Sequence, residues 1–154
     1  MANDSLSSDF TTSVFGPPLI GALLRRPWEA VQRHMLECLH TRGFADFDAA
    51  YLSVFQYPGP HGVRPSELAT RLRMSKQALN YLLGELERRD YLQRGPDPDD
   101  RRSKRIALTE RGVAAGHVIR DAVADMEAAW TKQLGPRRFA QLRKLLLEID
   151  TAAK

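Results

Sequence analysis

Apolar residues recur every three or four positions along most of this chain, which is the spacing of amphipathic helices. The first such stripe covers residues 17–41, where Pro17 and Pro18 suit a helix start and Gly43 suits a stop. Its apolar members are Leu19, Ile20, Leu23, Leu24, Trp28, Val31, Met35, Cys38 and Leu39. Pro27 lies inside the stripe and lacks a backbone N–H, so we expect it to kink the helix or split it in two.

A short helix is expected next. It begins at Asp46 or Asp48, which both suit an N-cap, and it ends near Gln56. A Pro- and Gly-rich break then follows over residues 57–62.

Two further helices are joined by a tight turn. Pro65 suits the first turn of one, and Ser75 is a good N-cap for the other, which is predicted over residues 76–89. Their inward-facing residues are predicted to be Leu68, Ala69, Leu72, Ala78, Leu79, Leu82, Leu83 and Leu86.

The pattern then changes to two short strands, predicted over residues 91–94 and 104–108, around a loop with two prolines. Thr109 can cap a long helix that runs from Glu110 to about Leu134 and ends at Gly135 and Pro136. The last helix, predicted over residues 136–152, carries one apolar face: Phe139, Leu142, Leu145, Leu146 and Ile149.

These elements outline a winged helix-turn-helix. The small Ala69 stands where the two helices meet, and Leu79 and Leu82 follow as the apolar clamp between them. Arg73 occupies the turn position where glycine is usual.

Charge supports binding to a polyanion. Residues 64–112 carry 12 Lys or Arg against 8 Asp or Glu, an excess equal to the net charge of +4 of the whole chain. The chain has 154 residues and 43% apolar residues, enough for one packed domain. Cys38 is the single cysteine, which fits a reducing compartment. No signal peptide or membrane-spanning stretch is evident, so we expect a cytoplasmic protein.

The wing carries a more specific motif. Asp100-x-Arg102, five residues, then Leu108-Thr109-x-x-Gly112 resembles the D-x-R-x-x-x-x-x-L-T-x-x-G pattern of the MarR family of regulators. Asp97-Pro98 just before it and Ser75-Lys76-Gln77-Ala78-Leu79 are also similar to that family. The close resemblance covers residues 64–112.

The resemblance implies a mainly α fold with a small β-wing. Residues 1–15 would form a flexible arm and residues 16–154 a single MarR-like domain. Within it, residues 46–112 would form the DNA-binding lobe, flanked by dimerisation helices over residues 16–45 and 113–154. The expected protein is a homodimer on a pseudo-palindromic operator, although the terminal helices packing on each other within a monomer is an alternative.

The recognition helix would present polar side chains to the major groove, where Gln77 and Asn80 suit adenine and Lys76 suits phosphate or guanine. The wing would reach the minor groove with its basic residues, Arg102 above all. The full set of expected DNA-binding residues is Arg64, Ser66, Arg73, Ser75, Lys76, Gln77, Asn80, Tyr81, Arg101, Arg102 and Lys104. Asp100 would pair with an arginine and hold the wing in shape. An ordinary solvated helix face and a solubilising hairpin are the alternatives.

By resemblance, a small aromatic or anionic effector would bind between the dimer helices and the lobe and release the DNA. Its expected lining residues are Trp28, Arg33, Tyr51, Phe55 and His117, each of which also suits an ordinary core or surface role.

Other chemistry has less support. His34 and Cys38 share a helix face, a spacing that suits a metal or a redox sensor, but two ligands make no metal site, and packing is the alternative role for Cys38. No metal, cofactor or enzymatic motif is expected. The predicted function is a sequence-specific double-stranded DNA-binding transcriptional regulator, a repressor released by an effector. The alternatives are a non-specific DNA-coating protein and a winged-helix protein-interaction module.

Overall fold

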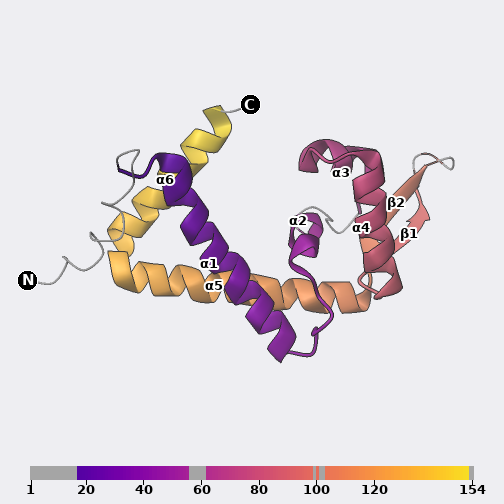
Figure 1. Ribbon diagram of the computed structural model, residues 1–154, viewed down its shortest axis with the longest axis horizontal. Coiled ribbons are helices and arrows are strands. Elements are labelled where there is room, and N and C mark those ends of the chain that lie inside the picture. Colours follow the sequence, from indigo (N-terminus) through magenta and orange to yellow (C-terminus); the bar gives the residue numbers. More distant parts are fainter. Residues whose placement is uncertain (1–16, 56–61, 99, 101–102, 153–154) are drawn as a thin grey trace, which may run out of the picture.

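The computed structural model describes residues 17–55, 62–98, 100 and 103–152, so the arm expected over residues 1–15 lies outside the described residues. The described chain is mainly helical with one two-stranded antiparallel sheet, which confirms the predicted fold class (Figure 1). In chain order the elements are α1 (Ile20–Thr41), the 3₁₀ helix η2 (Ala49–Tyr51), α2 (Leu52–Phe55), α3 (Pro65–Leu72), α4 (Lys76–Arg88), β1 (Leu92–Pro96), β2 (Lys104–Leu108), α5 (Glu110–Leu134) and α6 (Pro136–Ala152).

The first helix, α1, differs from the prediction in two ways. It begins at Ile20 rather than at the two prolines, and Pro27 does not split it. Pro27 is exposed, so its ring lies on the solvent side and only one backbone donor is lost. The predicted stripe is also buried over part of its length only, at Val31, Met35 and Leu39.

The short helix after α1 is capped as predicted, because the Asp48 carboxylate accepts a hydrogen bond from the Ala50 N–H at 2.8 Å. It begins as the 3₁₀ helix η2 and continues as α2. Gln56, its predicted end, and most of the predicted break lie outside the described residues.

The helix-turn-helix pair has the predicted bounds to within a residue. In α4 the buried side is Leu79, Leu83 and Leu86, whereas Leu82 is half-buried and Ala78 is exposed. The prediction that Ala78 faces inward is therefore wrong. The inward face of this helix is one narrow row at i, i+4 and i+7, and Ala78 lies beside it.

The wing pairs Leu92 with Leu108 at its base and Pro96 with Lys104 at its outer end. The first strand therefore starts one residue later than predicted and extends through Pro96, which leaves a shorter loop. A single bridge between Val63 and Ile106 adds the segment before α3 to the edge of β2. This bridge joins the wing to the helix-turn-helix.

The long helix α5 has the predicted bounds and connects the two ends of the molecule (Figure 1). It starts at the base of the wing, lies against α1, and reaches α6 at the end away from the lobe. Thr109 caps it by accepting from the Gly112 N–H at 3.0 Å, and Gly135 ends it with a positive φ of 81°. Of the apolar face predicted for α6, Phe139 alone is buried.

One hydrophobic core runs from the middle of α1 and α5 into the lobe. Its aromatic part is Phe47, Tyr51 and Tyr91, all buried, with Phe44 and Phe55 packed against them. Among the helices that the structure describes, none combines the length and the apolar character that a membrane span requires.

Candidate nucleic-acid interface

The turn between α3 and α4 is built around Arg73. Its backbone is left-handed, with φ 52° and ψ 37°, and the N–H groups of Arg73 and Met74 bond back to the last turn of α3. Glycine normally occupies such a position because a side chain is strained there. The turn thus keeps the geometry expected of a glycine while it directs an exposed arginine side chain to the surface.

Helix α4 begins at this turn with its N-terminal half exposed. The Ser75 hydroxyl accepts from the Ala78 N–H at 3.1 Å and caps the helix. Lys76, Gln77 and Asn80 are exposed, and 69% of Tyr81 is accessible. The four polar side chains predicted to read DNA therefore form an open surface on the first turns of the helix.

A cavity of about 270 Å³ lies between α3, α4 and β2. It is lined by Arg64, Pro65, Ser66, Ala69, Lys76, Leu79, Asn80, Ser103 and Lys104. Five of these residues were predicted from the sequence to bind DNA, although they come from three separate elements. The fold therefore gathers basic and polar groups around one concave surface with an apolar floor.

Gln77 and Tyr81 lie on the other side of α4. With Ser75 they line a shallow surface, together with the apolar residues Ala50, Met74, Ala78 and Leu82. The polar surface of α4 is thus divided into two rows at i, i+4 spacing, Lys76 and Asn80 toward the wing and Gln77 and Tyr81 toward η2.

A buried carboxylate joins the wing to α3. Asp97 is 1% exposed, and its Oδ2 lies 2.5 Å from Arg64 Nε and 3.2 Å from Arg105 Nε. The hydrogen bond and the charge of Asp97 raise the pKa of Arg64 above its ordinary value. Arg64, predicted to contact phosphate, thus also holds the wing against the start of α3.

Sequence reasoning did not find this role of Asp97. The residue belongs to the Asp97-Pro98 pair that resembles the family's wing, but its partner Arg64 is 33 positions earlier in the chain. An acidic residue in a basic, Pro-rich loop was the available signal.

The tip of the wing is described only in part. Arg101 and Arg102 lie outside the described residues, so their contact with DNA stays a prediction. Lys104 begins β2 and is exposed. Asp100 accepts a hydrogen bond from the Ser103 hydroxyl at 2.8 Å, and its carbonyl accepts from the Ser103 N–H at 2.9 Å.

The five residues expected to line an effector site lie in different surroundings. Tyr51 is 4% exposed and, with Phe55, packs on the Phe47 ring at centroid distances of 5.5 and 5.0 Å. Trp28 and Arg33 are exposed on α1, and His117 is exposed on α5. The cavities next to α4 are lined by other residues.

His34 and Cys38 do share a face of α1, with Nε2 and Sγ 3.7 Å apart. The same Nε2 lies 3.9 Å from Asp125 of α5. Within the described part of the chain, no group of three or more His, Cys, Asp or Glu side chains is arranged to hold a metal ion.

The fold and this surface define a winged helix-turn-helix protein, and comparison with solved structures agrees. Apo MarR from E. coli has 26% sequence identity and a TM-score of 0.66, over 86% of this chain and 96% of that chain. The transcriptional repressor CouR, bound to a 23-mer DNA duplex, has 28% identity and a TM-score of 0.65, over 86% and 92%. The S. aureus MepR–DNA complex has 20% identity and shares the fold, with a TM-score of 0.68 over 88% and 98%.

Sequence comparison points to the same family. The MarR family model matches residues 51–103. Two Bacillus subtilis regulators match as well: the uncharacterized HTH-type regulator YkoM at 29% identity over 87 residues, and the HTH-type regulator MhqR at 23% over 91 residues. The alignments cover 56% and 59% of this chain, and 55% and 61% of those relatives. The chain is therefore similar to MarR-family regulators in its fold and over the matched residues.

Proposed function

We propose that the protein is a homodimeric transcriptional regulator that binds double-stranded DNA at specific sequences. The observation that carries this proposal is the cavity between α3, α4 and β2, where five separately predicted residues surround one concave surface. Lysine and arginine there would neutralise phosphates, and the exposed carboxamide of Asn80 would meet base edges. CouR and MepR, which share the fold, were solved with DNA.

The two rows of α4 would divide the work of recognition. In this proposal Lys76 and Asn80 meet the strand nearest the wing, and Gln77 and Tyr81 meet bases on the other side of the helix. A carboxamide can donate to and accept from adenine at the same time, so Gln77 and Asn80 would favour A·T pairs.

Dimerisation is supported by the end of the molecule away from the lobe. Along the first turns of α1 and along α6, large apolar side chains remain exposed: Leu19, Ile20, Leu23, Leu24, Trp28, Leu142, Leu145, Leu146, Leu147 and Ile149. An apolar surface of this extent is typical of an interface. We propose that a second copy covers it, which leaves residues 46–112 as the DNA-binding lobe of each copy.

Repression and effector release are the finer part of the proposal. They rest on the family resemblance and on CouR, which is a transcriptional repressor. The effector would act by favouring a lobe arrangement that does not fit DNA. Trp28, Arg33 and His117 are accessible for such a ligand, whereas Tyr51 and Phe55 would have to be reached by a rearrangement of the aromatic core.

The test is selection of bound duplexes from a random pool at near-physiological salt, first with the unmodified protein. Enrichment of a pseudo-palindrome with half-sites about one helical turn apart is expected. Salt-sensitive binding without enrichment would indicate a DNA-coating protein, and no binding would favour a protein-interaction module.

Variants then assign the contacts. Asn80→Ala and Gln77→Ala should each relax the sequence at one position of the half-site, at a cost of about 1–3 kcal/mol. Lys76→Ala and Arg102→Ala should weaken binding to all sequences and reduce the salt dependence. The matched control is Lys132→Ala, which changes an exposed lysine at the other end of α5. It should change neither the affinity for DNA nor its salt dependence.

A further inference from the structure

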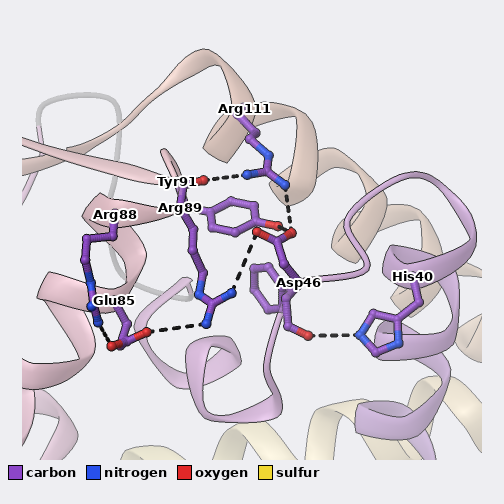
Figure 2. Close-up of polar contacts among 8 residues, drawn as sticks. His40, Asp46, Glu85, Arg88, Arg89, Tyr91 and Arg111 are labelled. Carbon is purple, nitrogen blue, oxygen red and sulfur yellow. Dashed lines mark hydrogen bonds and ion pairs between the residues drawn. The ribbon is translucent and has the colours of Figure 1, made fainter.

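Asp46 stands where the dimer helices meet the winged lobe. It lies in the segment between α1 and η2, and Figure 2 shows three side chains from other elements directed at it. Its Oδ1 accepts from the Tyr91 hydroxyl at 2.8 Å and from Arg111 Nη2 at 2.7 Å, and Arg89 Nη1 is 4.0 Å from its Oδ2. We call Asp46, Arg89, Tyr91 and Arg111 the junction cluster.

Arg111 connects three elements at once. It lies in the first turn of α5 and, besides its bond to Asp46, donates to the Arg89 carbonyl at the end of α4 at 2.5 Å. Its guanidinium also lies over the Tyr91 ring, 4.4 Å from the ring centroid. A planar guanidinium can make all these contacts together, which a lysine ammonium cannot. Arg89 is itself held by Glu85, which also pairs with Arg88 (Figure 2).

Close backbone contacts around the junction cluster hold the start of α5 against the segment before β1. A Cβ on Gly112 would lie 2.0 Å from the Tyr91 carbonyl oxygen, so α5 packs directly on the residue before β1. The Thr109 hydroxyl bonds to the Asp90 carbonyl. The Tyr91 side chain is fully buried, with the rings of Phe47 and Phe55 at 5.2 and 6.0 Å.

The polar contacts of the junction cluster persist at neutral pH. Burial opposes ionisation of Asp46, but hydrogen bonds from Tyr91 and Arg111 outweigh it, so the pKa of Asp46 lies below its ordinary value. Burial and the bond to Asp46 raise the pKa of Tyr91. The carboxylate therefore stays charged and the hydroxyl stays protonated, as the contacts require.

Because of the position of the junction cluster, a small change in angle there would move the lobe far enough to affect DNA binding. Helix α5 has 25 residues and carries the chain from the lobe to the end with the exposed apolar surface, a length of about 37 Å at 1.5 Å per residue. A tilt of about 10° at its first turn would move a lobe by roughly 6 Å relative to the dimer axis, close to two base-pair steps of about 3.4 Å.

We propose that Asp46 and Arg111 are positioning residues that fix the angle between the winged lobe and α5, and so set the half-site spacing that the dimer accepts. The proposal rests on the proposed function. It assigns spacing selectivity to residues that lie outside the surface facing DNA. A purely structural role would change stability alone, whereas a positioning role changes which spacing is bound.

The experiment measures affinity for duplexes that carry the selected half-sites at centre-to-centre spacings from about 8 to 13 base pairs, around the one-turn spacing. The unmodified protein should prefer one spacing at least tenfold. Asp46→Asn keeps an acceptor for the Tyr91 hydroxyl but loses the negative charge facing Arg111. Arg111→Lys keeps the positive charge but loses the planar guanidinium with its several donors. Both should reduce the preference to about threefold or less.

Controls separate the possible causes. Asp121→Asn breaks the pair with Arg42 between α1 and α5, at 3.2 Å, and should keep the preference. Tyr91→Phe retains the ring packing and removes one hydrogen bond, so it supplies a mild folded variant with a smaller loss of preference. An unchanged preference in every folded variant of the cluster would overturn the proposal. Failure of the unmodified protein to select any sequence would instead overturn the proposed function.

Discussion

The winged lobe and the opposite end of this molecule differ in how far their side chains are buried. In the winged lobe the aromatic side chains of Phe47, Tyr51 and Tyr91 are buried, and the Asp97 carboxylate is buried against two arginines. At the other end, the start of α1 and most of α6 expose large apolar side chains, with 81% of Leu19 and 60% of Ile149 accessible. The lobe buries its apolar side chains within a single chain. The end formed by α1 and α6 leaves an apolar surface that a single chain does not cover.

This difference separates two kinds of apolar periodicity. In both regions the sequence repeats apolar residues at helical spacing, yet the same spacing gives a core in α4 and an open face in α6. Burial depends on what lies opposite the helix, and for α6 that partner is in our proposal a second copy. Changes in the lobe should therefore act on folding, and changes at the far end should act on association.

The largest effect is expected for Gly112→Val. A Cβ at this position would overlap the Tyr91 carbonyl oxygen at 2.0 Å, so the start of α5 must move away from the lobe. We expect a loss of about 4 kcal/mol or more in the free energy of unfolding, measured by urea denaturation. Gly116→Ala on the same helix has nothing within 4 Å of its new Cβ and should gain up to about 1 kcal/mol. Equal losses in both would show that the close contact is not the cause.

Leu146→Asp should disrupt the proposed dimer interface on α6. It lies in the exposed apolar row of α6, and each dimer would lose two leucine side chains from the interface, at least about 3 kcal/mol in dimerisation free energy. Sedimentation should show monomers whose lobes stay folded, and affinity for paired half-sites should fall. Arg137→Asp places the same group on the opposite side of α6, nine positions before Leu146, and should leave a dimer. Dimers of Leu146→Asp would contradict the proposed interface.

Asp97→Asn tests the connection between the wing and α3. The variant keeps the size of the side chain but removes the negative charge beside Arg64 and Arg105. Because Asp97 is buried and both arginines are partly exposed, we expect a loss of about 2–3 kcal/mol, less than for a fully buried pair. Hydrogen exchange should increase at the Val63–Ile106 bridge first. A uniform increase over the whole chain would argue against a local role.

Acid should weaken the junction cluster in a defined direction. The pKa of Asp46 is lowered in the folded protein by Tyr91 and Arg111, so its stabilisation is complete above the unfolded value of about 3.9 and is lost as the pH falls through the folded pKa. Asp46→Asn should cost about 1 kcal/mol at pH 7, because the carboxylate is partly exposed. Thermal melts from pH 7 to 3 should show the two proteins converging. A constant difference would contradict the assignment.

Local signals predicted much of the fold. The bounds of α5 follow from Thr109 at its start and Gly135 with Pro136 at its end, and both signals act within a few residues. The helix-turn-helix followed from Pro65, Ser75 and the apolar spacing between them. Capping and turn chemistry are properties of short segments, so a sequence displays them directly.

Long-range contacts were not predictable in the same way. The pairing of Arg64 with Asp97 and the contacts of Asp46 with Tyr91 and Arg111 join residues 33, 45 and 65 positions apart. No periodicity connects such positions. The gathering of Arg64, Lys76 and Lys104 at one cavity was predicted only as a set of residue types, and the contact of Arg102 with DNA stays a prediction.

Arg73→Gly should give the smallest change in stability and the most informative one. The left-handed backbone at φ 52° strains an arginine, and glycine relieves that strain at some entropic cost, so we expect a gain of about 0.5–1 kcal/mol in thermal or urea unfolding. If the exposed Arg73 side chain contacts phosphate as predicted, the same variant should bind DNA more weakly, with the salt slope reduced by about 1. Stability and DNA affinity would then change in opposite directions. This result is expected when a strained backbone is kept at a turn because the side chain there binds DNA. A gain in stability with unchanged binding would leave the arginine without that role, and no gain would mean that other contacts of Arg73 offset the strain.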